Sequence, residues 1–123
     1  MATDQLLLNE GLTFVNLLKI TVLDLRFAVW YTDPSTLRES LALGAPSLDA
    51  IGPKSAYELI DGVIDTFRNS HHLIKSDSIK ILSLQSDLGK TFQQSFSNQT
   101  GNSAIGMFVT TGHVLHNVFA YKI

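Results

Sequence analysis

Cysteine is absent from this chain of 123 residues, proline occurs three times, and only 16% of the residues are charged. Without cysteine, the chain has no disulfide framework, no cysteine-ligated zinc or iron–sulfur centre and no cysteine nucleophile. Nine Lys and Arg against eleven Asp and Glu give a formal charge of −2, without a run of basic residues. The sequence thus lacks the basic surface that nucleic acids require, and we expect no nucleic acid partner.

A membrane-spanning segment is not predicted either. The most apolar stretch, residues 12–31, contains Lys19, Asp24 and Arg26, and each charge near the centre of a bilayer costs about 2.5–3.5 kcal/mol. Asp4 stands where a secretory signal would have basic residues. We therefore expect a cytoplasmic protein with no membrane partner, folded as a single domain over residues 1–123.

The first apolar segment, residues 4–31, permits two interpretations. Apolar residues recur at seven-residue intervals, as the buried face of a helix requires: Leu8, Val15, Val22 and Val29. From residue 21 onward, however, β-branched and aromatic residues alternate with Asp24 and Arg26, which is typical of a strand. We favour the helix and keep the strand as the alternative.

Further elements are predicted in the middle of the chain. Asp33 and Pro34 form a typical helix start and Gly44 a typical end, which indicates a short helix over residues 34–43. After a loop that ends at Gly52-Pro53, an amphipathic pattern predicts the clearest helix of the chain, closing at residues 69–70. Residues 78–84 then read as a strand.

The last quarter of the chain differs in character. Residues 91–123 carry one formal charge, that of Lys122, and ten of the fourteen residues 91–104 are Ser, Thr, Asn or Gln. Such a segment is either buried or paired with another chain. The alternation from Ile105 onward, and a turn in which Gly112 can take a positive φ, predict a C-terminal β-hairpin. The fold class is therefore α+β.

A phosphate loop is suggested only weakly. Gly89, Lys90 and Thr91 follow a predicted strand, but Leu84 stands where the first glycine of that motif should be. We interpret these residues as a turn with an exposed lysine.

Histidines and carboxylates give no clear site. Of the two histidine pairs, residues 71–72 and residues 113 and 116, the second pair points to opposite faces of the predicted strand, and no acid follows Asp87. Glu58, Asp61 and Asp65 share the polar face of a helix, which we interpret as solvated surface. We predict no metal site and no cofactor.

Aromatic residues offer a candidate ligand pocket. Trp30 and Tyr121 can line a pocket for an apolar small molecule, because aromatic rings supply contact area and one polar group. His116 or His72 is then the candidate base. A core without a ligand accounts for the same aromatic residues.

Four short fragments resemble the nuclear transport factor 2-like superfamily. They are residues 32–37 (TDPSTL, a break between two helices), 52–54 (GPK, the entry to the third helix), 92–96 (FQQSF, a late strand) and 114–119 (VLHNVF, the closing strand). Residues 85–90 are too short for the strand pair normally found there, and Val118 replaces a frequent Asp. The resemblance implies N-terminal helices packed on a curved antiparallel sheet as a cone with an apolar pocket, often dimerising through the sheet. No catalytic residue transfers.

Two functions follow from these observations. We favour a non-enzymatic domain that forms homo-oligomers or binds a protein partner through its uncharged C-terminal sheet, because exposed edge strands normally carry Lys, Glu or Pro. The expected interface residues are Ile105, Met107, Val109, Val114 and Val118. The hairpin can instead lie in the centre of the sheet, under the helices. The other function is a small-molecule-binding cone that acts as an isomerase, cyclase or hydrolase on an apolar substrate.

Overall fold

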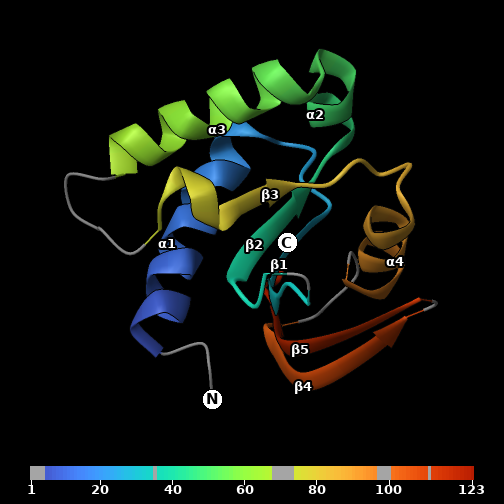
Figure 1. Cartoon of the computed structure of the whole chain (residues 1–123). Coiled ribbons are helices and arrows are strands. Elements are labelled where there is room, and N and C mark those ends of the chain that lie inside the picture. The colour runs from blue at the N-terminus through green and yellow to red at the C-terminus, as the bar shows by residue number, and fades with distance from the viewer. Residues whose placement is uncertain (1–4, 35, 68–73, 97–100, 111) are drawn as a thin grey trace.

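A five-stranded sheet with helices on both faces forms the body of the protein (Figure 1). The structure is a computed structural model that describes residues 5–34, 36–67, 74–96, 101–110 and 112–123. The strands lie in the order β3-β2-β1-β5-β4 and comprise β1 (Phe27–Thr32), β2 (Glu39–Gly44), β3 (Ile79–Ile81), β4 (Ser103–Thr110) and β5 (His113–Ala120). The predicted α+β class is confirmed, but the sheet is mixed, because β3 runs parallel to β2 while the other neighbours are antiparallel.

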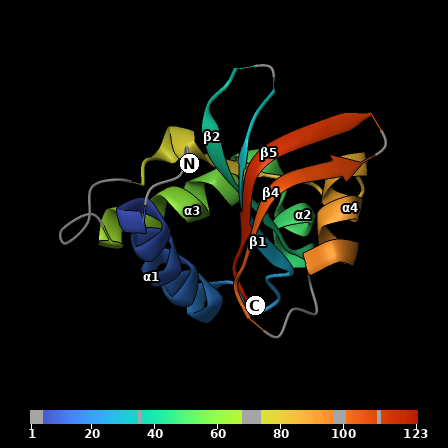
Figure 2. The same ribbon diagram turned by 90° about the horizontal axis from the view of Figure 1, so that it is seen from below.

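The helices divide between the two faces of the sheet (Figure 2). They are α1 (Gln5–Thr21), α2 (Pro46–Ile51), α3 (Pro53–Phe67) and α4 (Asp87–Phe96), with a short 3-10 helix at Ser76–Ser78. The helices α1 and α3 cover one face, and α4 covers the other. None of the helices that the structure describes is long and apolar enough to span a bilayer.

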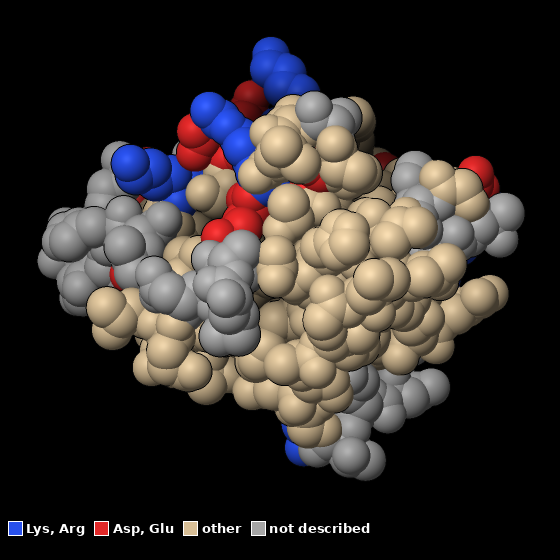
Figure 3. Space-filling view, turned by 60° about the horizontal axis from the view of Figure 1, so that its bottom comes forward, with Lys and Arg blue, Asp and Glu red and all other residues tan. Residues whose placement is uncertain are grey.

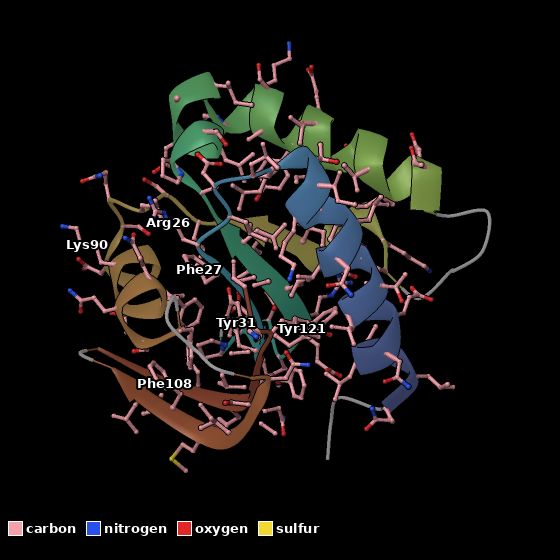
Figure 4. All side chains as sticks on the ribbon, turned by 180° about the vertical axis from the view of Figure 1, so that it is seen from behind. Arg26, Phe27, Tyr31, Lys90, Phe108 and Tyr121 are labelled. Carbon is pink, nitrogen blue, oxygen red and sulfur yellow. The ribbon has the colours of Figure 1, made fainter. Side chains whose placement is uncertain are left out.

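Each face of the sheet has its own hydrophobic core. On the first face, side chains of α1 and α3 pack on the strands, chiefly Phe14, Leu18, Ile60, Ile64, Trp30 and Leu41. On the second face, aromatic rings of α4 contact rings of β1 and β4, namely Phe92, Phe96, Phe27, Tyr31 and Phe108 (Figure 4). The sheet is therefore buried on both sides where these helices lie.

The two interpretations of residues 4–31 each hold for one part of the segment. The helix α1 ends at Thr21, and the strand β1 begins at Phe27. The predicted helix over residues 34–43 is wrong, because Glu39–Gly44 form the strand β2, and the Asp33 N–H donates to the Arg38 C=O at 2.8 Å across the turn between β1 and β2. Pairing of β2 with β1 outweighs the local helix-start signal.

The amphipathic helix after Pro53 is confirmed as α3, and Glu58, Asp61 and Asp65 are exposed on it. The strand predicted over residues 78–84 is confirmed only at Ile79–Ile81.

The helix α4 was not predicted. Its buried residues Gly89, Phe92 and Phe96 have the spacing of one helix face, but few apolar residues carry this pattern in a mostly polar sequence. The turn predicted at residues 89–91 is wrong, because these residues lie inside α4. The fragment 92–96 is likewise helical, rather than the late strand that the resemblance implies.

At Gly11, α1 comes close to the sheet because of a buried hydrogen-bonded pair. The Trp30 indole Nε1–H donates to the Tyr121 hydroxyl oxygen at 2.9 Å, and this hydroxyl donates to the Leu8 C=O at 2.8 Å. A Cβ at position 11 would overlap the Tyr121 hydroxyl and lie 2.9 Å from the Trp30 Nε1. Only glycine fits between this pair and the helix axis.

Replacing this glycine tests the close approach. We expect Gly11→Ala to lower the free energy of unfolding by about 1–3 kcal/mol through overpacking, measured by urea unfolding. The control is Gly62→Ala in α3, where an added Cβ meets nothing within 4 Å. Because alanine favours a helix over glycine by about 1 kcal/mol, the control should be slightly more stable than the wild type. Equal stabilisation by both substitutions would contradict the close approach.

Candidate functional site

The two edge strands of the sheet differ in whether side chains bind their outer main-chain groups. At the β3 edge, the Ile81 N–H donates to the Tyr57 hydroxyl oxygen at 3.0 Å, and just beyond the strand the Leu84 N–H donates to the Asp49 carboxylate at 2.9 Å. Side chains of α3 and α2 thus satisfy main-chain groups that a neighbouring strand would otherwise bind. Because β3 is also only three residues long, this edge is closed to strand addition.

The opposite edge, formed by β4, is open. The strand is eight residues long and contains no Lys, Glu or Pro, and among the strands that the structure describes it pairs only with β5. Within the part of the chain that the structure describes, no hydrogen bond reaches β4 from its outer side. Among the described residues, this edge therefore lacks the charged side chains and prolines that usually protect an edge strand.

The alternation of side chains along β4 contains a change of phase at its centre. Ile105 and Phe108 are three residues apart, yet both pack on the α4 side of the sheet. Asn117 in the neighbouring strand has φ +55°, and the register between β5 and β1 shifts beside it. These features mark a β-bulge in β5. The alternation of side chains in β4 changes at the positions opposite this bulge.

Because of this phase change, four side-chain positions of β4 lie on the same surface. Ala104, Gly106, Met107 and Val109 are exposed, with Met107 at 57% and Val109 at 68% of their full accessibility. Val114 in β5, opposite Val109, is 46% exposed. We call the surface made by these five residues the outer face of the hairpin. Figure 3 shows a broad surface without charged side chains on this side of the molecule.

The residues predicted for an interface divide between the two faces of the hairpin. Met107, Val109 and Val114 lie on the outer face, where they are exposed. Ile105 and Val118 pair with each other across the strands and pack in the core beside α4, where Val118 is 2% exposed. The sequence alternation suggested one face for all of them because it does not show the phase change. A glycine inside a strand, here Gly106, was the available signal.

The candidate pocket residues do not line a common cavity. Trp30 and Tyr121 do meet, but both are about 1% exposed and α1 fills the space beside them at Gly11. His116 is exposed on β5, paired with Met107 of β4 and with Thr32 of β1. His72 lies outside the described residues. Trp30 and Tyr121 are therefore core residues that orient α1.

A shallow apolar groove lies elsewhere, between the N-terminal turn of α1 and the hairpin. Its volume is about 230 Å³. The lining residues are Gln5, Leu8, Ala104, Ile105, Gly106, Asn117, Val118 and Phe119, none of which is charged. Among these described residues, Gln5 and Asn117 are the only ones with polar side chains, and both carry an amide group.

One ion pair joins the β1–β2 turn to β3. The Lys80 Nζ lies 2.7 Å from the Asp33 Oδ2, and the Asp33 side chain is 11% exposed. The hydrogen bond to Asp33 raises the pKa of Lys80 above its ordinary value. Lys80 therefore stays protonated at neutral pH, which suits an anchor of the turn and not a catalytic base.

No metal centre is formed by the described residues, since no three of their His, Asp or Glu side chains lie close enough to hold an ion. Of the candidate histidines, His71 and His72 lie outside those residues, and only the backbone of His113 is described.

Comparisons with protein-family models, with curated proteins and with solved structures find no match for this chain. The function is therefore inferred from the geometry of the open edge and the groove.

The buried Tyr121 predicts a distinct dependence of stability on pH. Burial raises the pKa of the Tyr121 hydroxyl well above its usual value near 10. The unfolded chain therefore releases this proton first, so the stabilisation is complete below about pH 10 and declines as the pH rises further. At neutral pH we expect Tyr121→Phe to lower the free energy of unfolding by about 1–3 kcal/mol, because Trp30 and Leu8 lose their partner.

Measuring urea unfolding of both proteins from about pH 8 to about pH 11 checks this prediction. The difference in stability between the wild type and Tyr121→Phe should narrow above about pH 10, since only the wild type has this group to titrate. Burial also raises the pKa of Tyr31, but Tyr31 is present in both proteins and cancels in the difference. A difference that stays constant across this range contradicts the account.

Proposed function

We propose that the protein is a non-enzymatic interaction domain that self-associates through the open β4 edge and the outer face of the hairpin. The observation that carries the proposal is the contrast between the two sheet edges. Tyr57 and Asp49 close the β3 edge, whereas β4 offers eight residues without a protecting charge or proline. An unpaired edge strand is a template for a further strand, which satisfies its main-chain groups.

The side chains on this surface favour a protein partner over water. Met107, Val109 and Val114 are apolar and largely exposed in the single chain. Fully burying one such side chain stabilises a complex by about 1.5–3 kcal/mol, so partial burial of several adds a substantial driving force. Because β4 and β5 contain no Lys, Arg, Asp or Glu, two copies meet there without repulsion between like charges of these residues.

A charge on the outer face should abolish association without unfolding the chain. We expect Met107→Glu to weaken self-association by about 100-fold or more, equivalent to about 2.8 kcal/mol, because a carboxylate would be desolvated without a counter-ion. Light scattering at tens of micromolar should show an assembly for the wild type and a monomer for the variant. Circular dichroism should be unchanged, since Met107 is already 57% exposed in the single chain.

The matched control is Leu23→Glu, which makes the same chemical change in the turn after α1, at a side chain 86% exposed. This variant should associate like the wild type. A wild-type protein that is monomeric at tens of micromolar, or a Met107→Glu variant that still assembles, contradicts the proposal. Loss of the helical signal in Met107→Glu would show that this side chain belongs to the core.

The groove beside α1 supports a second candidate function, binding of a neutral apolar small molecule. Its volume, about 230 Å³, exceeds the roughly 150 Å³ of an apolar cavity known to hold benzene. Among the described residues of the lining there is no acid, base or histidine, which suits binding of a hydrocarbon group and offers none of them for general acid–base chemistry. This candidate differs from the predicted pocket in every residue that lines it.

A neutral fluorescent probe tests the groove. N-Phenyl-1-naphthylamine should bind the wild type, and octanol should displace it more effectively than octanoate, because no cation in the groove pairs with a carboxylate. We expect Gln5→Phe to weaken probe binding about tenfold by filling the groove from α1, away from the β4 edge. Asn16→Phe, at an exposed position of the same helix, is the control. Equal binding by both variants contradicts the assignment.

A further inference from the structure

The main-chain groups of β4 that face the open edge follow an uneven spacing. At the end of the hairpin where β4 starts, the Tyr121 N–H donates to the Ala28 C=O at 3.0 Å. The main-chain groups of Tyr121 therefore point to β1, and those of Ala120 point to β4. Ala120 pairs with Ser103. Alternation along an antiparallel ladder then directs the main-chain groups of Ala104 and Gly106 away from β5, to the open edge.

The other half of β4 has the opposite phase. Thr110 and His113 pair across two intervening residues, and the closing pair of such a tight turn is hydrogen-bonded. Alternation from this pair directs the main-chain groups of Met107 and Val109 to the open edge.

The outward positions are thus Ala104, Gly106, Met107 and Val109, separated by two, one and two residues. A regular foreign strand presents outward groups at every second residue, so it can match only one half of this edge. The pattern is symmetric about the midpoint between Gly106 and Met107. An antiparallel copy of β4, turned about an axis at that midpoint, matches all four positions.

We propose that the partner at this edge is a second copy of the chain, held antiparallel about a twofold axis between Gly106 and Met107. This inference rests on the self-association proposed above and adds its register. Ala104 of each copy lies opposite Val109 of the other, and Gly106 lies opposite Met107. The β-bulge then serves as a specificity device that favours a second copy over regular strands.

Side-chain sizes fit this register. On the outer face, Met107 lies beside a glycine of the second copy, and Val109 lies beside an alanine, so each large side chain meets a small one. On the other face, Ile105 lies opposite Phe108, and both are apolar. None of the eight residues is charged, so no like charges meet across the axis. Because the β3 edge is closed by Tyr57 and Asp49, strand addition stops at two copies.

The absence of cysteine allows a direct test by cross-linking. In the double variant Ala104→Cys/Val109→Cys, thiols of two copies lie opposite each other, at a separation of about 5.5 Å between Cα atoms. In either single variant, the two thiols are offset by five residues, about 17 Å along the strands. A bis-maleimide too short for that offset should convert the double variant, and neither single variant, to a covalent dimer of twice the chain mass.

The outcomes separate this inference from the proposed function. Cross-linking of the double variant alone, with circular dichroism and light scattering as for the wild type, supports the register. Association without cross-linking of the double variant, or with equal cross-linking of a single variant, overturns the register and leaves self-association intact. A wild-type protein that is monomeric by light scattering overturns both.

Discussion

The hydrogen-bonded pair of Trp30 and Tyr121 beneath Gly11 determines how the other elements are arranged. Trp30 belongs to β1, Tyr121 follows β5, and the Tyr121 hydroxyl reaches the Leu8 C=O in α1. One buried contact therefore joins the first helix, the first strand and the last strand. Since β5 is held beside β1 in this way, its hairpin partner β4 is left at the edge of the sheet.

Sequence patterns predicted those elements that local side-chain chemistry determines. The apolar stripe of α3 and the turn at Gly112, which has φ +85°, are local features and are confirmed. The helix predicted over residues 34–43 was wrong because Leu41, Ala42 and Leu43 pack in a strand beside β1, a contact that capping signals do not report. The helix α4 escaped prediction because Phe92 and Phe96 form its apolar face within a polar sequence.

The sequence indicated that part of the hairpin is exposed and apolar, but not which residues lie there. The scarcity of charge in residues 91–123 indicated an unprotected sheet surface, and Met107, Val109 and Val114 do form one. The assignment of Ile105 and Val118 to the same surface depended on unbroken alternation. The bulge at Asn117 breaks it, and its positive φ is set by pairing with β1, which sequence spacing does not reveal.

The interior position of β5, between β1 and β4, has a consequence for folding. The contact between Trp30 and Tyr121 spans 91 positions of the chain, and β1 has β5 as a neighbour on one side. Contacts so distant in sequence slow folding, because a large loop must close before they form. During synthesis, β1 and β2 can pair early, but one edge of β1 stays open until residues 113–121 have been made. Throughout that interval, the nascent chain exposes an apolar strand to other chains and to chaperones.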